Sequence, residues 1–142
     1  MDISRTLYEE ARRFSPCSLF RGNETGEELM DLFASPQGTE FCMKHDFPSM
    51  ARFRAFGGDM AEKRGIYIDS GARRLKNARI AILVGDCDFD LEYDTLDHPC
   101  KVVLMKGARA RVSASGYSVV KIERQEGCLV TCHAHDNAVI RI

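Results

Sequence analysis

The segment that decides the fold is Val112-Ser-Ala-Ser-Gly-Tyr-Ser-Val-Val-Lys-Ile122, which recurs 20 residues later as Cys132-His-Ala-His-Asp-Asn-Ala-Val-Ile-Arg-Ile142. In both copies small or apolar residues alternate with polar ones, the pattern of a β-strand with one buried face. A short polar turn interrupts each copy, Ser115-Gly116 in the first and Asp136-Asn137 in the second. Such a repeat predicts a coil that climbs one step per repeat and stacks similar residues on each other.

Similar short strands are expected upstream and around this repeat. Their predicted positions are 66–68, 80–84, 89–91, 102–105, 108–114, 118–122, 129–134 and 138–142. Further tight turns are expected at Gly85-Asp86, Lys106-Gly107 and Glu126-Gly127. We therefore predict a short β-solenoid. An antiparallel β-sandwich or barrel is the alternative, because two-residue turns also form hairpins.

The apolar residue types divide the chain into two parts. Residues 1–56 hold seven of the eight Phe and no Val, whereas residues 57–142 hold all eight Val and seven of the eight Ile. Because β-branched residues favour strands, this break predicts an α+β fold. A helical subdomain, 1–56, would cap one end of a β-rich subdomain, 57–142, with the joint at Gly57-Gly58 and one cooperative unit overall.

Four short helices are expected in residues 1–56. The first is predicted by apolar residues at helical spacing, Ile3, Leu7, Ala11 and Phe14. Ser15-Pro16 would end it. Thr25 and Glu28 have the spacing of a capping box at the start of the second helix. Pro36 and Pro48 mark the starts of the third and fourth.

Composition and charge exclude several function classes. The 142 residues contain 20 Lys and Arg against 21 Asp and Glu, so no net field attracts nucleic acid or an anionic membrane. No apolar run is long enough to span a bilayer, and residues 1–10 lack the apolar core of a secretory signal. We therefore expect a cytoplasmic protein without a membrane partner.

The acidic run Asp86-Cys-Asp-Phe-Asp-Leu-Glu-Tyr-Asp94 suggests calcium binding at first sight. An EF-hand loop would need Gly at the position of Leu91 and Glu at the position of Asp97, so the motif fails. The alternation fits a strand with a charged outer face instead. Arg109 and Arg111 have the same outward phase one repeat later, which predicts a ladder of opposite charges.

The densest group of metal-type ligands is Cys128, Cys132, His133, His135 and Asp136. Strand alternation puts the two cysteines on the inner face and the two histidines on the outer face, so they do not converge. We interpret the cysteines as buried thiols. A surface metal or acid–base site at His133 and His135 remains an alternative.

The only basic cluster is Arg73, Arg74, Lys76 and Arg79. It could contact nucleic acid or an acidic partner, but no aromatic residue interleaves it for base stacking. We interpret it as a charged solenoid face and expect no nucleic-acid partner. The chain also lacks a GxSxG nucleophile motif and the glycine-rich phosphate-binding motifs, so no catalytic residue and no cofactor is assigned.

The alternation of Ala110, Val112, Ala114, Gly116 and Ser118, repeated from Val130 onward, resembles the repeats of short parallel β-helices in uncharacterised bacterial and phage proteins. The resemblance covers about residues 108–142. It implies a β-helix architecture and a link to phage or mobile-element proteins, and it implies no reaction.

These observations predict a non-enzymatic structural or protein-interaction protein built on a β-repeat scaffold. The alternatives are a small metal-binding protein or enzyme centred on His133 and His135, and a nucleic-acid-associated accessory protein. The last strand has no Pro, Gly or charge run after it. We therefore expect self-association, or binding of a protein partner, through an oligomer edge at Val139, Ile140 and Ile142, most simply as a two-fold pair.

The absence of any CxxC motif and of a secretory signal predicts that all six cysteines are reduced. Alkylation during lysis in denaturant blocks every reduced cysteine before it can oxidise, so the intact mass should show six added alkyl groups. Four or fewer would contradict the assigned compartment.

Overall fold

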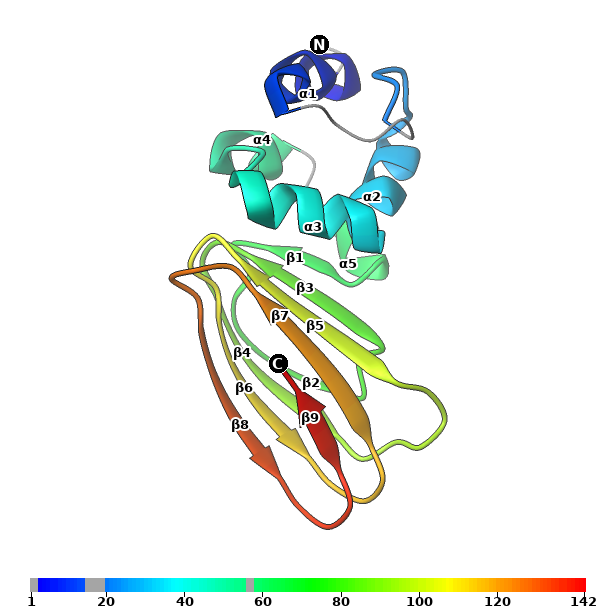
Figure 1. Cartoon of the computed structure of the whole chain (residues 1–142), viewed down its shortest axis with the longest axis vertical. Coiled ribbons are helices and arrows are strands. Elements are labelled where there is room, and N and C mark those ends of the chain that lie inside the picture. The colour runs from blue at the N-terminus through cyan, green and yellow to red at the C-terminus, as the bar shows by residue number, and fades with distance from the viewer. Residues whose placement is uncertain (1–2, 15–19, 56–57) are drawn as a thin grey trace. The chain divides into compact units, whose positions relative to one another are not determined.

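The chain divides into two compact units, Met1–Arg64 and Gly65–Ile142. The structure is a computed structural model that describes residues 3–14, 20–55 and 58–142 (Figure 1). The first unit is helical, and the second is a parallel β-solenoid of about four coils. The predicted α+β fold with a short solenoid is confirmed, and the alternative of an antiparallel sandwich or barrel is wrong.

The helical unit contains a series of short helices. Their bounds are α1 Ile3–Ala11, the 3-10 turn η1 Arg12–Phe14, α2 Gly26–Ala34, α3 Pro36–His45, α4 Met50–Ala55 and α5 Asp59–Lys63. The predicted capping box at α2 is present, because the Glu28 amide donates to Thr25 Oγ1 and the Thr25 amide donates to Glu28 Oε1. Pro36 is the first residue of α3, as expected. The predicted stop at Ser15-Pro16 lies outside the described residues.

Aromatic side chains form the core of the helical unit. The rings of Phe33 and Phe53 meet edge to face with centroids 5.3 Å apart, and both residues are buried. Phe14, Phe41 and Phe47 form a second group, with centroids 5.9 to 6.2 Å apart. The concentration of Phe in this part of the sequence therefore supplies its core.

The boundary between the units lies later than the sequence indicated. We predicted the joint at Gly57-Gly58, of which Gly57 lies outside the described residues. The structure places helix α5 after Gly58 and divides the chain between Arg64 and Gly65. Asp59–Lys63 has no apolar periodicity long enough to mark a helix, which is why composition alone missed it.

The solenoid alternates strands between two parallel sheets. The strands are β1 Ile66–Ile68, β2 Gly71–Lys76, β3 Ile80–Val84, β4 Cys87–Tyr93, β5 Cys100–Met105, β6 Arg109–Ala114, β7 Val119–Arg124, β8 Leu129–Ala134 and β9 Val139–Arg141. One sheet has the order β1-β3-β5-β7-β9 and the other β2-β4-β6-β8 (Figure 1). Each coil therefore contributes one strand to each sheet.

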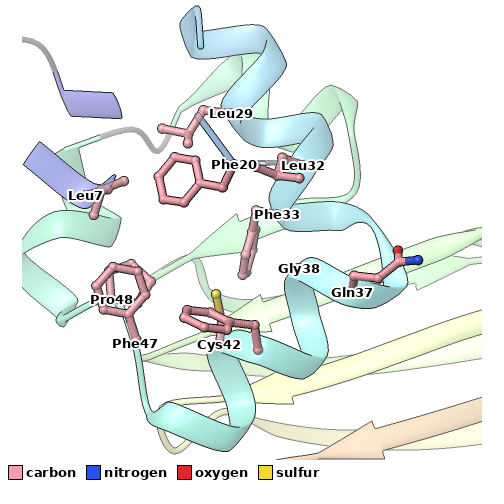
Figure 2. Close-up of a pocket in the computed structure, with 11 residues that line it drawn as sticks. Leu7, Phe20, Leu29, Leu32, Phe33, Gln37, Gly38, Cys42, Phe47 and Pro48 are labelled. Atoms are coloured by element: carbon pink, nitrogen blue, oxygen red, sulfur yellow. The ribbon is translucent and has the colours of Figure 1, made fainter. Parts of the chain in front are cut away.

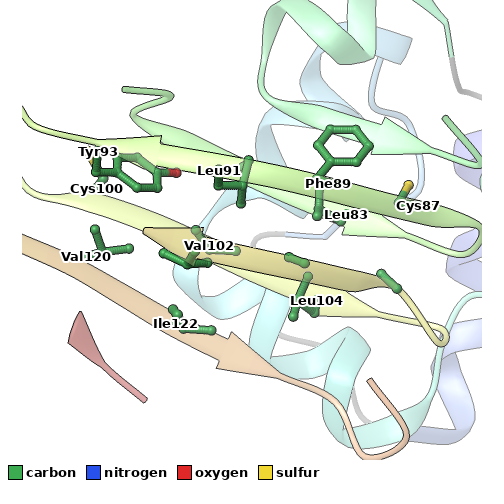
Figure 3. Packing of buried hydrophobic residues seen from close by; sticks show 14 of the residues in the cluster. Leu83, Cys87, Phe89, Leu91, Tyr93, Cys100, Val102, Leu104, Val120 and Ile122 are labelled. Atoms are coloured by element: carbon green, nitrogen blue, oxygen red, sulfur yellow. The ribbon is translucent and has the colours of Figure 1, made fainter. Parts of the chain in front are cut away.

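The register confirms the repeat that the sequence shows. Val112 pairs with Cys132 and Val120 pairs with Ile140, each at the predicted offset of 20 residues. The inward residues of successive strands pack into one apolar core, in which Phe89, Leu91 and Val102 are almost fully buried (Figure 3). Stacking equivalent positions therefore places apolar side chains along the interior of the solenoid.

Polar side chains at the turns connect neighbouring coils. Asp69 Oδ1 accepts from the Asp86 amide and Asn77 Oδ1 accepts from the Asp94 amide, both at 2.8 Å. Gln125 Oε1 accepts from the Lys106 amide at 2.9 Å in the same way. Asp69 and Asn77 have φ angles of 49° and 55°, a left-handed conformation that Asp and Asn tolerate. These side chains satisfy amides that the strands leave without a partner.

Strand β2 was not predicted. This strand has basic residues on both of its faces. Arg74 and Lys76 are on the outer face, and Arg73 is at the inward register position beside Phe89. An arginine at an inward position removes the apolar alternation that marks a strand. The sequence pattern of this segment therefore indicates a basic cluster and not a strand.

Substituting Val112 tests the assignment of the inward face. Val112→Asp places a charge without a partner in the core, so we expect a loss on the order of 3 kcal/mol or more in the free energy of unfolding, measured with urea. Thr131→Asp is the matched control. Thr131 is exposed and pairs with Arg111, so its loss should stay within about 0.5 kcal/mol. Equal stability of Val112→Asp and the wild type would contradict the register.

Candidate functional site

The two histidines predicted as a metal or acid–base site lie on the outside of the solenoid. His133 points outward from β8 opposite Ser113, and His135 begins the following turn, where its amide donates to the Ala114 carbonyl at 2.9 Å. Within residues 3–14, 20–55 and 58–142, no group of three or more His, Cys, Asp or Glu side chains could hold a metal ion. The pair therefore has no third ligand from the part of the chain that the structure describes.

The cysteines of the same segment face the interior, as predicted. Cys128 is buried and Cys132 is half-buried. Burial raises the pKa of the Cys132 thiol, and it raises that of Cys87 in the same way. A thiol that stays protonated is a poor nucleophile, so these residues act as small apolar side chains. Cys17 lies outside the described residues.

The four side chains of the basic cluster are all exposed, but they do not share one face of the strand. Arg74 and Lys76 lie on the outer face of β2, whereas the guanidinium of Arg73 lies 5.6 Å from the centre of the Tyr67 ring. Arg79 lies in the connection to β3, where its carbonyl accepts from the Lys101 amide. Strand alternation and the turn thus separate four cations that are adjacent in sequence.

The acidic run forms the predicted ladder of opposite charges. Arg111 pairs with Asp88 at 2.8 Å and also with Asp90, and Arg109 lies 3.6 Å from Asp86. These carboxylates raise the pKa of Arg111 further above its usual range. All of these side chains are substantially exposed, so the ladder contributes little to stability. Its carboxylates are engaged by arginines of the next coil rather than directed at one point.

A polar cleft lies where the strands of the second sheet end. Its volume is about 210 Å³, and its lining includes Lys76, Glu92, Asp94, Ser113 and His135. Sequence analysis singled out His135 and Lys76 but did not bring them together, because they lie almost three repeats apart. The 20-residue repeat places His135 one coil after Ser115, beside the end of the preceding strand. Extending the repeat in this way could have shown that His135 lies near the other residues of the cleft.

Asp94 is the most constrained side chain of the cleft. Asn77 Nδ2 donates to Asp94 Oδ1 at 2.7 Å, and Lys76 Nζ lies 3.4 Å from Asp94 Oδ2. The hydrogen bond from Asn77, and secondly that from Lys76, hold the pKa of the Asp94 carboxyl below its ordinary value. Asp94 is therefore an ionised structural acceptor, not a proton donor.

The helical unit contains a small apolar pocket. Its volume is about 60 Å³, and it lies among Leu7, Leu29, Phe33, Cys42 and Phe47 (Figure 2). A lining of this kind fits an apolar group or stays empty. Its described lining carries no charged side chain, so it offers no acid–base chemistry.

The last coil differs from the others in its exposure. Val130, Cys132 and Ile140 point into the coil but remain only half-buried, whereas Val112 and Val120, one coil earlier, are fully buried. The last coil also exposes the large apolar side chains of Leu129, Val139 and Ile142, and the preceding coil exposes those of Tyr117 and Val119. The predicted oligomer edge at Val139, Ile140 and Ile142 therefore belongs to a larger apolar surface.

Strands β8 and β9 pair on one side only (Figure 1). The Leu129 amide donates to the carbonyl of Ala108, directly before β6, and the His135 amide donates to the carbonyl of Ala114, the last residue of β6. The Val139 amide donates to the Ser118 carbonyl. In a β-strand the amide and carbonyl of one residue point to the same side, and those of the next residue point to the opposite side. The amides and carbonyls of Val130, Cys132, Ala134 and Ile140 therefore face away from the sheet. We call β8, β9 and these four residues the open edge.

Comparisons with family models, with curated proteins and with solved structures give no match. None of the described helices is both long and apolar enough to cross a bilayer. The interpretation of the protein therefore depends on its own geometry.

Replacing Asn77 tests the electrostatics of the cleft. Asn77→Gly removes the hydrogen bonds to Asp94 but accepts the positive φ, so the Asp94 pKa should rise toward its ordinary value in an NMR titration, with Lys76 still lowering it in part. Since the wild-type pKa is lowered, the contact stabilises the fold above the ordinary carboxyl pKa, and this stabilisation is lost as the pH falls through the lowered value. Lys76→Met, the control for the weaker cause, should give a smaller shift. An unchanged titration in Asn77→Gly would contradict this origin.

Proposed function

We propose that the protein is a non-enzymatic structural scaffold that binds a protein strand along the open edge. The observation that carries the proposal is the half-burial of inward side chains in the last coil, whose counterparts in the preceding coil are buried. A strand added beside β8 would cover Val130 and Cys132 and pair the outward-facing amides. Strand addition of this kind combines backbone hydrogen bonds with side-chain pockets.

The composition of the open edge supports this role. Proteins protect free strand edges with charged residues, proline or bulges. Strand β8, Leu-Val-Thr-Cys-His-Ala, contains no acidic residue, lysine, arginine or proline. Strand β2, at the other end of the same sheet, contains Arg73, Arg74 and Lys76. The two ends of the sheet are therefore built differently, because β2 carries lysine and arginine and β8 carries none of the residues that usually protect a strand edge.

The alternative functions have weaker support. A metal site or enzyme at His133 and His135 would need further ligands or a nucleophile, and the polar cleft contains His135 without His133. A nucleic-acid role would need a continuous basic surface, and strand alternation divides the cluster at Arg73. As part of the proposal we place the scaffold in the cytoplasm, because no disulfide joins the described cysteines.

A labelled eight-residue peptide that alternates valine with threonine tests the proposal. At protein concentrations where the chain is monomeric, we expect saturable binding by fluorescence anisotropy. Cys132→Pro removes an edge-facing amide while leaving the bonds to β6, so it should weaken binding about tenfold. Ala134→Pro, at the exposed end of β8, should act in the same direction.

Cys132→Ala is the matched control, because it changes the same side chain but keeps the amide, and it should bind like the wild type. A circular-dichroism melt checks that each variant is folded. Absence of saturable binding to the wild type, or equal binding by folded proline variants, would show that the edge does not accept a strand.

A further inference from the structure

We infer that the occupant of the open edge is a second copy of this chain, joined tail to tail so that β8 of one copy pairs antiparallel with β8 of the other about a two-fold axis at Cys132. This inference depends on the proposed function, because it names the partner of the same edge.

The distribution of charge favours pairing of two β8 ends (tail to tail) over pairing of a β8 end with a β2 end (head to tail). In a head-to-tail stack β8 would pair with β2 of the next copy, which would carry Arg73 into the coil interior beside Val130 or Cys132. Burying this cation against apolar side chains is unfavourable. Two β8 strands bring no charged side chains together, because β8 contains no acidic residue, lysine or arginine. The tail-to-tail arrangement also closes after two copies, whereas head-to-tail stacking continues without limit.

The backbone selects the register of the pair. The edge-facing residues of β8 are Val130, Cys132 and Ala134. In an antiparallel pair, hydrogen bonds form between edge-facing residues of both strands. Only one register uses all three from each copy: Cys132 meets Cys132 on the axis, and Val130 meets Ala134. On the outer face this register places Thr131 beside His133, with no like charges in contact.

Pairing of β8 with itself is preferred over pairing with β9. Strand β9 covers only Val139–Arg141, and Ile140 is its only residue within the strand whose amide faces the edge. A β8–β9 pair would therefore leave edge-facing groups of β8 without partners. In the β8–β8 arrangement the same axis also brings the two β9 strands together, which would cover the half-buried Ile140.

Cys132 makes the register measurable. In the inferred register the two Cys132 residues form a hydrogen-bonded pair with Cα atoms about 5.5 Å apart, which lies within the range of about 4.4–6.8 Å that a disulfide spans. Diamide, which takes one hydrogen from each of two thiols as the disulfide forms, should therefore cross-link the pair. The other described cysteines, at 42, 87, 100 and 128, are buried within their own chain.

Analytical ultracentrifugation of the full chain tests the association. We expect the wild type to sediment at twice its 16.0 kDa mass at micromolar concentration, with no larger species. Cys132→Pro and Ala134→Pro should shift the dimer toward monomer by about tenfold in dissociation constant. Arg73→Ala should leave the dimer unchanged, because β2 is distant from the edge. Species that grow with concentration, or a dimer insensitive to both folded proline variants, would overturn the tail-to-tail arrangement.

Diamide treatment should give a covalent dimer on a non-reducing gel in the wild type and none in Cys132→Ala, which should still sediment as a dimer. A covalent dimer that persists in Cys132→Ala would overturn the register. A chain that stays monomeric but binds the valine–threonine peptide would overturn the second copy while the proposed function stands. A monomer that also fails to bind the peptide would overturn both.

Discussion

The parallel hydrogen-bond ladder between successive coils is the constraint on which the β unit depends. A single coil exposes one row of amides and carbonyls on each side and has an interior only one side chain deep, so it needs a neighbour on both sides. The pairs Val112–Cys132 and Val120–Ile140 show how strictly the ladder keeps equivalent residues together. The burial of Phe89 and Leu91, and the half-burial of Val130, follow from the presence or absence of a neighbouring coil.

The turns make this ladder possible. Each turn must reverse the chain into the opposite sheet and still satisfy its own backbone amides. Asp69, Asn77 and Gln125 do so by accepting hydrogen bonds from the turn of an adjacent coil. Polar residues of the turns thus join coils as the strands do. Asn77 also holds Asp94 as an ionised acceptor in the cleft. Asn77 therefore both stabilises the turn and lowers the pKa of Asp94 in the cleft.

The two ends of the second sheet have different chemistry, and this difference carries the functional proposal. Strand β2 has basic residues on both of its faces, including Arg73 at an inward position. Strand β8 continues the apolar interior and carries no acidic residue, lysine, arginine or proline. A charged end resists addition of a further strand because the cation would be desolvated, whereas an uncharged end with half-buried side chains gains by it. The polarity of the sheet therefore predicts where a partner strand binds and in which direction.

The sequence by itself predicted the β-solenoid, the 20-residue step from β5 to β9 and the inward face from Ala110 to Cys132, because alternation and repeat length are local properties that register preserves. It also determined the capping box at Thr25 and the ladder between Arg111 and the acidic run. It missed β2, since Arg73 interrupts the alternation, and it missed α5, which is too short to show periodicity. Only the tertiary structure decided that Lys76, Asp94 and His135 line one cleft and that the amides of Val130, Cys132 and Ala134 face outward. Those facts depend on which residues of distant coils lie side by side, and the stacking of coils fixes that arrangement, not the local sequence.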